Sequence, residues 1–279
     1  MRAGVIAGPR DARVATAPVP APAAGEVLVR IEGCGVCVSN LPVWEGRPWF
    51  EYPLETGTPG HEGWGVVEAC GAGVDDPAPG ERVALICERA FAEYAVVPAA
   101  HCVPIGERRF PGEPVAAAVN VVRRSDIRAG QRVAIVGLGF LGSLVEQLCE
   151  RAGAEVVPIR RETSAEGEFE RVIEAAGTQE ALDRASALVA ERGCLVIAGY
   201  HQDGPRTVDM QSWNWRGIDV VNAHERDPLV YVDAMREAVS VGLDVEPLLT
   251  HRFPLGRLGE AFEAARTRPA GFVKAWVEP

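Results

Sequence analysis

The sequence predicts a two-domain α/β protein, in which a β-rich domain is followed by a doubly wound parallel sheet. Two observations lead to this class. The first ~110 residues hold short valine-rich runs separated by glycine and proline, which is typical of strands joined by turns in a small barrel or sandwich. From about residue 120, strand-like runs alternate with amphipathic helical patterns, which is typical of a parallel sheet with crossover helices.

Individual elements follow from these patterns. Strands of the first part are expected in the runs at 25–37, 63–74, 80–88 and 91–98. In the second part we expect strands near 132–136, 155–159, 169–177, 193–200 and 217–225, with helices after the first of them and at 178–192. Two further amphipathic helices (228–242 and 255–269) and a closing strand (271–277) complete the chain.

Composition limits the classes of function. The net charge is −11 and no basic run is long enough to follow a phosphate backbone, which argues against a nucleic-acid partner. No run approaches the ~18 apolar residues of a membrane helix, and the apolar part of the N-terminal segment is too short for a signal peptide. Seven scattered cysteines argue against a disulfide framework. We expect a cytoplasmic enzyme or binding protein without a membrane partner.

A glycine-rich turn carries the clearest chemical signal. Gly137, Gly139 and Gly142, with Phe140 and Leu141 between the last two, form G-x-G-x-x-G between a buried strand and a helix. Such glycines allow a tight turn, close approach of a pyrophosphate and close helix packing, and the helix N-terminus then faces the phosphates. The turn therefore predicts a dinucleotide site. A merely tight turn is the alternative.

The second strand of this unit ends in Arg160 and Arg161, where an acidic residue usually holds a ribose 2′-hydroxyl. Two guanidinium groups would pair with a 2′-phosphate, which favours NADP over NAD, although NAD stays possible. The alternative is a solvated basic strand end.

The adjacent residues His61 and Glu62 lie between two glycines at the start of an apolar run. Both side chains are able to bind a metal ion. An ordinary solvated turn is the other interpretation.

Several motifs taken together resemble the medium-chain dehydrogenase/reductase family, the zinc alcohol and polyol dehydrogenases. They are CGVCVSN, PGHEGWGVV, GERV, FAEY and VAIVGLGFLG, in this order over nearly the whole chain. The resemblance implies a GroES-like catalytic domain at 1–119, a shortened Rossmann domain at 120–223 and a return to the catalytic domain at 224–279. It also implies one catalytic zinc ion, a nicotinamide cofactor, a small alcohol or ketone as substrate, and a homodimer.

The resemblance assigns roles by position. Cys37 corresponds to the thiolate ligand of zinc, His61 to the imidazole ligand, and Glu62 to a carboxylate that binds or swings onto the metal. Glu113 resembles the glutamate ligand of the polyol branch. Ser39 corresponds to the residue that hydrogen-bonds the reacting hydroxyl and passes its proton outward.

Other readings of these residues stay open. The pair Cys34 and Cys37 could be a redox pair or two buried thiols, and Glu62 could form a structural pair with an arginine. Cys87 and Cys102 are expected to be core thiols, because the four-cysteine structural zinc lobe of the family is missing.

Two further departures bear on function. Asn40 stands where the family has an aspartate that orients the metal-binding histidine, and losing such a partner typically weakens metal binding or activity by ~10–100-fold. The connector at 162–168 is too short for the helix, edge strand and second helix that the family has there. The lost strand would lie at the sheet edge, so the rest of the sheet is expected to close.

The function expected first is zinc-dependent, NAD(P)-linked interconversion of a small polar secondary alcohol and its ketone. The alcohol would be a polyol, a cyclitol, an amino alcohol or a sugar-derived alcohol. The alternative is a non-redox metal-assisted lyase or cyclase, or a binding protein, on the same scaffold. A zinc-free quinone or enone reductase is a third possibility, against which Cys37, His61 and Glu62 argue.

A few other polar and aromatic residues stand out. Tyr200, His201 and Gln202 follow a parallel strand and could touch a ligand. Packing is expected for Trp213 to Trp215 and for His224, and Lys274 is expected to be solvated.

Overall fold

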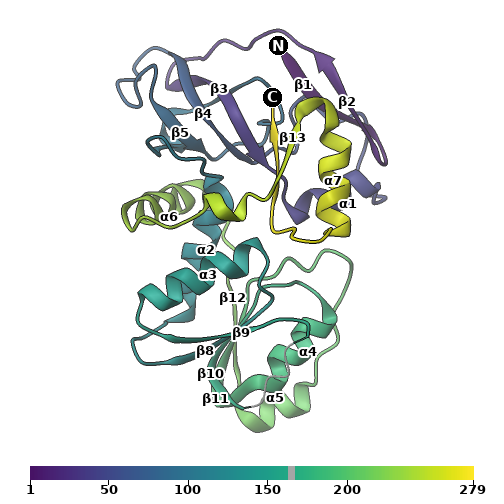
Figure 1. Cartoon of the computed structure of the whole chain (residues 1–279), viewed down its shortest axis with the longest axis vertical. Coiled ribbons are helices and arrows are strands. Elements are labelled where there is room, and N and C mark those ends of the chain that lie inside the picture. Colours follow the sequence, from purple (N-terminus) through teal and green to yellow (C-terminus); the bar gives the residue numbers. More distant parts are fainter. Residues whose placement is uncertain (163–166) are drawn as a thin grey trace. The chain divides into compact units, whose positions relative to one another are not determined.

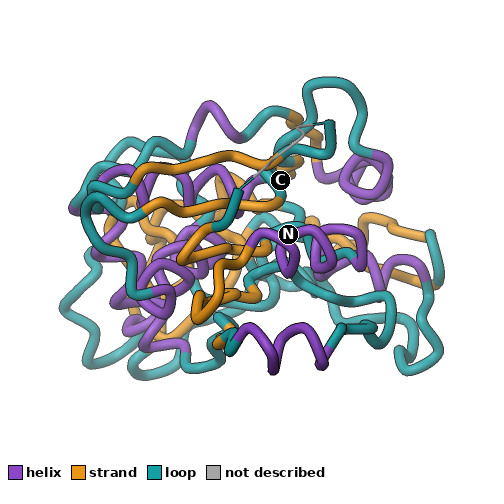
Figure 2. The backbone as a smooth tube through the Cα atoms, turned by 90° about the horizontal axis from the view of Figure 1, so that it is seen from below, coloured by secondary structure: helices purple, strands orange, loops and turns teal. Residues whose placement is uncertain are grey.

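The computed structural model describes residues 1–162 and 167–279, and it divides into two compact units (Figure 1). The first unit comprises Met1–Ala116 and Asp227–Pro279, and the second comprises Ala117–Arg226. Strands and helices of both units can be followed in Figure 2. The predicted α/β class is confirmed, since one unit is built on a mainly antiparallel sheet and the other on a parallel one.

The first unit is built on a sheet whose described strands number seven, in the order β13-β14-β3-β4-β5-β7, with β6 paired to β3. These strands are β3 (Glu26–Gly35), β4 (Glu62–Cys70), β5 (Arg82–Leu85), β6 (Tyr94–Pro98), β7 (Cys102–Pro104), β13 (His251–Pro254) and β14 (Ala275–Glu278). A hairpin of β1 (Arg2–Gly8) and β2 (Asp11–Thr16) precedes them, which the sequence patterns did not predict.

Segments from both ends of the chain share one core in this unit. The alternating side chains Val27, Val29 and Ile31 of β3 are buried, and they lie in the same apolar cluster as Phe91 and Phe262. Phe262 belongs to α7 (Leu258–Thr267), one of the two predicted C-terminal helices, and the other is α6 (Pro228–Ser240). The short helix α1 (Leu41–Glu45) follows a 3₁₀ turn, η1 (Val38–Asn40). Helix α2 (Gly112–Ser125) contains the point where the chain passes from the first unit to the second.

The second unit is built on a parallel sheet whose described strands follow the order β12-β11-β10-β8-β9. The strands are β8 (Arg132–Val136), β9 (Glu155–Ile159), β10 (Phe169–Glu174), β11 (Val189–Ile197) and β12 (Asp219–Asn222). This is the doubly wound order 3-2-1-4-5-6 without its third strand, so β9 is an edge strand. The connector expected to be short falls partly on 163–166, which lie outside the described residues.

Three helices accompany this sheet: α3 (Phe140–Arg151), α4 (Gln179–Leu188) and α5 (Met210–Arg216). The helix expected at 178–192 ends earlier, because Val189 is buried and pairs with Phe169 of β10. A buried β-branched residue opposite a neighbouring strand favours extended backbone over another helical turn. In the described part of the chain, no helix is both long and apolar enough to cross a membrane.

Candidate metal centre and nucleotide site

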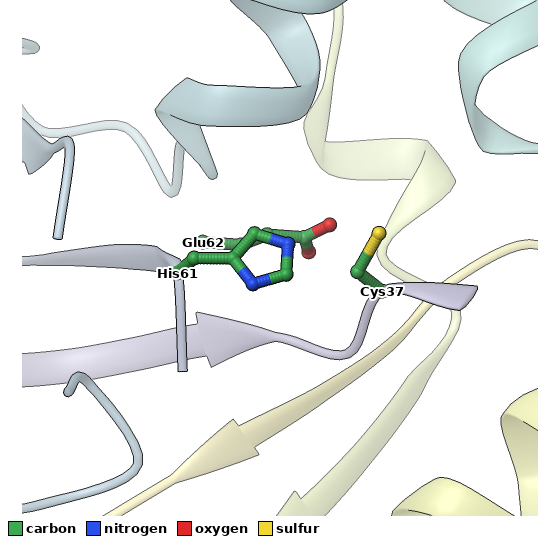
Figure 3. Close-up of side chains that lie close together, drawn as sticks. All are labelled: Cys37, His61 and Glu62. Carbon is green, nitrogen blue, oxygen red and sulfur yellow. The ribbon is translucent and has the colours of Figure 1, made fainter. Parts of the chain in front are cut away.

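Cys37, His61 and Glu62 each offer a ligand atom, and these atoms all lie within 4.8 Å of one another. Figure 3 shows the sulfur, the imidazole and the carboxylate directed toward a common space. The family resemblance implied this grouping of a soft sulfur donor with harder nitrogen and oxygen donors.

The pairing of β3 with β4 brings the three residues together. The strands are antiparallel, and Gly35 near the end of β3 pairs with Glu62 at the start of β4. Cys37 lies just beyond one strand and His61 just before the other, so the register places them side by side. A Cβ atom at Gly35 would overlap the Glu62 carboxylate, so only glycine leaves room for Glu62 there.

The His61 ring is oriented by a backbone carbonyl. Its Nδ1 lies 3.0 Å from the carbonyl oxygen of Pro59, so a proton on Nδ1 is donated there. In the neutral imidazole, the form that binds a metal ion, Nε2 then carries the lone pair, and this atom lies 3.5 Å from the Ser39 hydroxyl. A metal-binding histidine usually donates its second ring nitrogen to a carboxylate, a carbonyl or water, and Pro59 fills that position here.

Asn40 ties the two ligand-bearing segments to each other. This buried side chain accepts a hydrogen bond from the Cys37 backbone N–H at 3.0 Å and donates to the Pro59 carbonyl at 3.1 Å. Its Nδ2 is also 3.4 Å from the Nδ1 of His61. Asn40 therefore supports the Cys37 turn and the carbonyl that orients His61.

Glu62 is fully buried and pairs with Lys274 of the segment before β14 at 2.6 Å. The expectation that Lys274 is solvated was wrong, because this lysine is only 6% exposed. Burial lowers the pKa of Lys274, but the charges of Glu62, Cys37 and Glu113 and the hydrogen bond to Glu62 together outweigh this, and the net shift is upward. The partner of Glu62 is thus a lysine rather than an arginine. No local pattern could have revealed it, since 212 positions separate the two residues.

Glu113 lies beside this cluster, with a carboxylate oxygen 4.0 Å from the Nε2 of His61. Burial raises the pKa of Glu113, and the charge of His61 lowers it less strongly. Burial also lowers the pKa of His61, but a hydrogen bond with the Cys37 side chain and the charges of Cys37, Glu113 and Glu62 raise it to about 10 overall. The cluster therefore attracts positive charge.

These donors fit a zinc ion. Among the residues that the structure describes, the second carboxylate oxygen of Glu62 is buried and has no hydrogen-bond partner. An unpaired buried carboxylate oxygen is costly, and a cation beside it removes that cost. Thiolate, imidazole and carboxylate are the ligands that Zn²⁺ takes in proteins.

Three further thiols of this unit, those of Cys34, Cys87 and Cys102, have pKa values that burial raises. Cys34 and Cys102 are buried, and burial raises the pKa of Cys34 well above its usual value and that of Cys102 to about 12. Burial likewise raises the pKa of the Cys87 thiol to about 12. These three side chains stay protonated at neutral pH, which is consistent with packing roles, and all seven cysteines are free.

The glycine-rich turn of the second unit joins β8 to α3, as predicted. Gly137 has φ +102°, a backbone conformation that favours glycine, and a Cβ at Gly142 would overlap the carbonyl oxygen of Gly137. Gly139 is the N-cap of α3 and supplies no side chain to its first N–H groups. The turn thus has the close packing and the open helix N-terminus that a pyrophosphate requires.

Arg160 and Arg161 follow β9 and are exposed. Because parallel strands end at the same sheet edge, the ends of β8 and β9 lie at one edge, where ligands bind in such sheets. These positions are consistent with the predicted nucleotide site.

His201 is held on both ring nitrogens. Its Nε2 lies 2.9 Å from the buried carboxylate of Glu174, and its Nδ1 accepts from Arg206 at 2.8 Å. The other oxygen of Glu174 accepts from the backbone N–H groups of Ala176 and Gly177, both at 2.7 Å. This histidine therefore anchors the turns that follow β10 and β11 and has no ring nitrogen left for a substrate.

The aromatic residues and the histidine for which the sequence predicted packing or ligand contact differ in their burial. Trp213 packs against the apolar cluster of this unit, as expected. Trp215 is 89% exposed and His224 is exposed, so packing does not explain them. Tyr200 is also largely exposed.

Comparison with known proteins finds similarity to dehydrogenases over nearly the whole chain. Residues 23–107 match the alcohol dehydrogenase GroES-like domain. The chain is 25% identical to L-galactonate-5-dehydrogenase of Escherichia coli (strain K12) over 307 positions, covering 88% of this chain and 89% of the relative. It is also 25% identical to human sorbitol dehydrogenase over 328 positions, covering 93% of this chain and 91% of the relative.

Among solved structures, a cobalt- and zinc-bound thermostable alcohol dehydrogenase from Pyrobaculum aerophilum superposes with a TM-score of 0.85 at 24% identity. The match covers 100% of this chain and 99% of the other, and it shows the same fold. The fold, the ordered motifs and these similarities together support a member of the medium-chain dehydrogenase/reductase family and an NAD(P)-linked, alcohol dehydrogenase-like oxidoreductase.

Proposed function

We propose that the protein is a zinc-dependent, NADP-preferring dehydrogenase that interconverts a small polar secondary alcohol and its ketone. The observation that carries the proposal is the cluster of Cys37, His61 and Glu62, whose ligand atoms lie within 4.8 Å of one another. Cys37 and His61 hold one catalytic ion, with Glu62 and Glu113 as carboxylate ligands. A bound zinc ion supplies Lewis-acid stabilisation of negative charge on the substrate oxygen.

The chain's own residues orient the substrate and move its proton. Ser39 lies beside His61 in the structure, and its hydroxyl would accept a hydrogen bond from the alcohol and, on taking that proton, release its own to solvent. The carbonyl of Pro59 keeps the Nε2 lone pair of His61 directed into the site. Lys274 pairs with one oxygen of Glu62, so the negative charge of this buried carboxylate is compensated.

The cofactor is held in the second unit. Gly137, Gly139 and Gly142, with Phe140 and Leu141 at the start of α3, receive the pyrophosphate. Arg160 and Arg161 bind the 2′-phosphate that distinguishes NADP from NAD, because guanidinium groups form paired hydrogen bonds with phosphate oxygens.

The substrate class follows from the relatives and the ligand set. Both curated relatives named above are dehydrogenases of polyhydroxylated compounds, one of L-galactonate and one of sorbitol. Carboxylate ligands beside a single thiolate suit a hydrophilic site. We therefore place the substrate among polyols and sugar-derived alcohols.

Assembly and location complete the proposal. The strand β12 lies at the sheet edge opposite β9, and Val220 on it and Met210 and Trp215 of the adjacent α5 are exposed. A second copy pairing there would give a homodimer. The free thiols favour the cytoplasm, where disulfides are rare.

The first test is a fluorescence titration of the purified protein with NADPH, with NADH as comparator, together with measurement of bound zinc. We expect one zinc per chain, a micromolar NADPH dissociation constant, and loss of that affinity in Arg160→Asp. Cys37→Ala should lose zinc, whereas the half-buried control Cys70→Ala should keep it. Stoichiometric zinc without binding of either nucleotide would replace the dehydrogenase proposal with non-redox metal chemistry, and absence of both would sink it.

A further inference from the structure

A third arginine contacts the turn that carries Arg160 and Arg161. The Nη1 of Arg184 donates to the carbonyl oxygen of Arg160 at 2.6 Å and lies 3.5 Å from that of Arg161. Arg184 belongs to α4 and is half-buried, whereas the other two arginines are exposed. The bond connects two elements that are not neighbours along the chain.

The shortened sheet explains why this contact forms. Helix α4 packs against β10, β8 and β11, whereas β9 has lost the strand that would lie beyond it in a complete doubly wound sheet. The carbonyl groups at the end of an edge strand need donors, because an unpaired backbone group is costly wherever water is partly excluded. Arg184 reaches from α4 to the end of β9 and supplies that donor.

The contact also concentrates positive charge. Three guanidinium groups belong to one turn or touch its backbone. Glu162 follows Arg161 in the chain, and the carboxylate of Glu146 on α3 interacts with Arg160. Close like charges repel each other, and a phosphate monoester, which carries about −1.5 to −2 at neutral pH, relieves that repulsion.

We propose that Arg184 is a positioning residue for cofactor specificity, which fixes the Arg160–Arg161 turn and adds a third positive charge for the 2′-phosphate of NADP. This inference rests on the NADP preference proposed above and extends it. It assigns the selection between the two cofactors to α4 as well as to the end of β9. In this arrangement α4 supplies part of the support that the missing edge elements would have given.

The test compares Arg184→Ala with wild type in NADPH and NADH titrations. The NADPH dissociation constant should rise about 10-fold, as expected for loss of one charge-assisted interaction of ~1.4 kcal/mol, and that for NADH should change less than about 2-fold. The control Arg128→Ala removes the same charge from an exposed residue that pairs with Asp126, and it should leave both constants unchanged. If Arg184→Ala does not fold, Arg184→Gln takes its place under the same criterion.

The ratio of the two constants decides the result, because a purely structural role would weaken both nucleotides alike. Equal weakening of NADPH and NADH, or no change in either, would overturn the role of Arg184 while leaving wild-type NADPH preference intact. A wild-type preference for NADH would instead remove the proposed NADP preference, and this inference with it. The two failures are therefore distinguishable.

Discussion

The proposed metal centre of the first unit and the proposed nucleotide site of the second hold their charged groups in opposite ways. Around the metal centre, Glu62 is fully buried, its ion pair with Lys274 is buried, and Asn40 and Pro59 restrain the ligand segments. At the nucleotide site, Arg160 and Arg161 are exposed at the end of an edge strand. A buried charge depends strongly on its partner, whereas an exposed one is screened by water and salt.

This difference indicates which substitutions should affect each unit most. Loss of a partner in the first unit leaves a charge or a polar atom without compensation in a medium of low dielectric. Loss of one cation in the second unit should change affinity for an anionic ligand more than it changes folding.

Lys274→Met should lower the free energy of unfolding of the metal-free protein by about 3–5 kcal/mol, because it leaves Glu62 buried without a partner. Arg252→Met, which removes an exposed pair with Glu278 on the neighbouring strand, should cost at most about 1 kcal/mol. Urea denaturation of both variants measures the difference. Adding Glu62→Gln should recover part of the Lys274→Met loss, and equal costs for the two single variants would contradict the contrast.

Gly142→Ala should destabilise the second unit by about 1–3 kcal/mol and weaken nucleotide binding, because the new methyl group would overlap the Gly137 carbonyl. Gly256→Ala is the matched control, since a Cβ there meets no atom within 4 Å. Thermal unfolding and NADPH titration report the two effects. An unchanged NADPH constant in Gly142→Ala would show that the turn tolerates displacement.

Asn40→Ala should weaken zinc binding by about 10–100-fold, as is typical when a residue that orients a ligand is lost. Asn120→Ala removes a comparable buried amide that donates to the Ala223 carbonyl at 2.6 Å in the other unit, and it should leave zinc affinity unchanged. Competition with a chelator gives both affinities. Equal zinc affinity in Asn40→Ala and wild type would mean that the Pro59 carbonyl alone orients His61.

Zinc affinity should rise about tenfold per pH unit between pH 6.5 and 8.5, because the pKa of His61 in the metal-free protein is raised to about 10 and zinc must displace that proton. The stability of the metal-free protein depends on pH in the opposite direction. Because the pKa of His61 is raised in the folded state, its protonated form stabilises the metal-free fold fully below about pH 6.5. This stabilisation is lost as the pH rises through about 10. Chelator competition across this range checks the first statement, and a flat profile would show that His61 is already neutral.

Much of the site was predictable from local signals. The glycines of the nucleotide turn, the neighbouring His61 and Glu62, and the thiol of Cys37 carry chemistry that residue type and spacing reveal. The family resemblance then grouped Cys37 with His61, and the structure brings them together through the register of β3 and β4. Their roles as zinc ligands stay a proposal.

Other features were out of reach of the sequence. Lys274 lies in the run that predicts a short closing strand, where a charged residue is usually solvated. Its burial depends on the ion pair with Glu62, which lies 212 positions away in the sequence. The departure at Asn40 was visible, but its partners Cys37 N–H and Pro59 C=O were not. The exposure of Trp215 likewise could not be inferred from a run of aromatic residues.

Residue type and spacing predict the α/β class, the alternation of strands and helices, the glycine turn and the candidate donor atoms, because these depend on side-chain period and on backbone freedom at single residues. Only the tertiary structure decided which buried charges meet, which carbonyl orients His61, and that Arg184 reaches the end of β9. Such contacts join residues distant in sequence, and strand register and helix packing fix them through the whole chain at once.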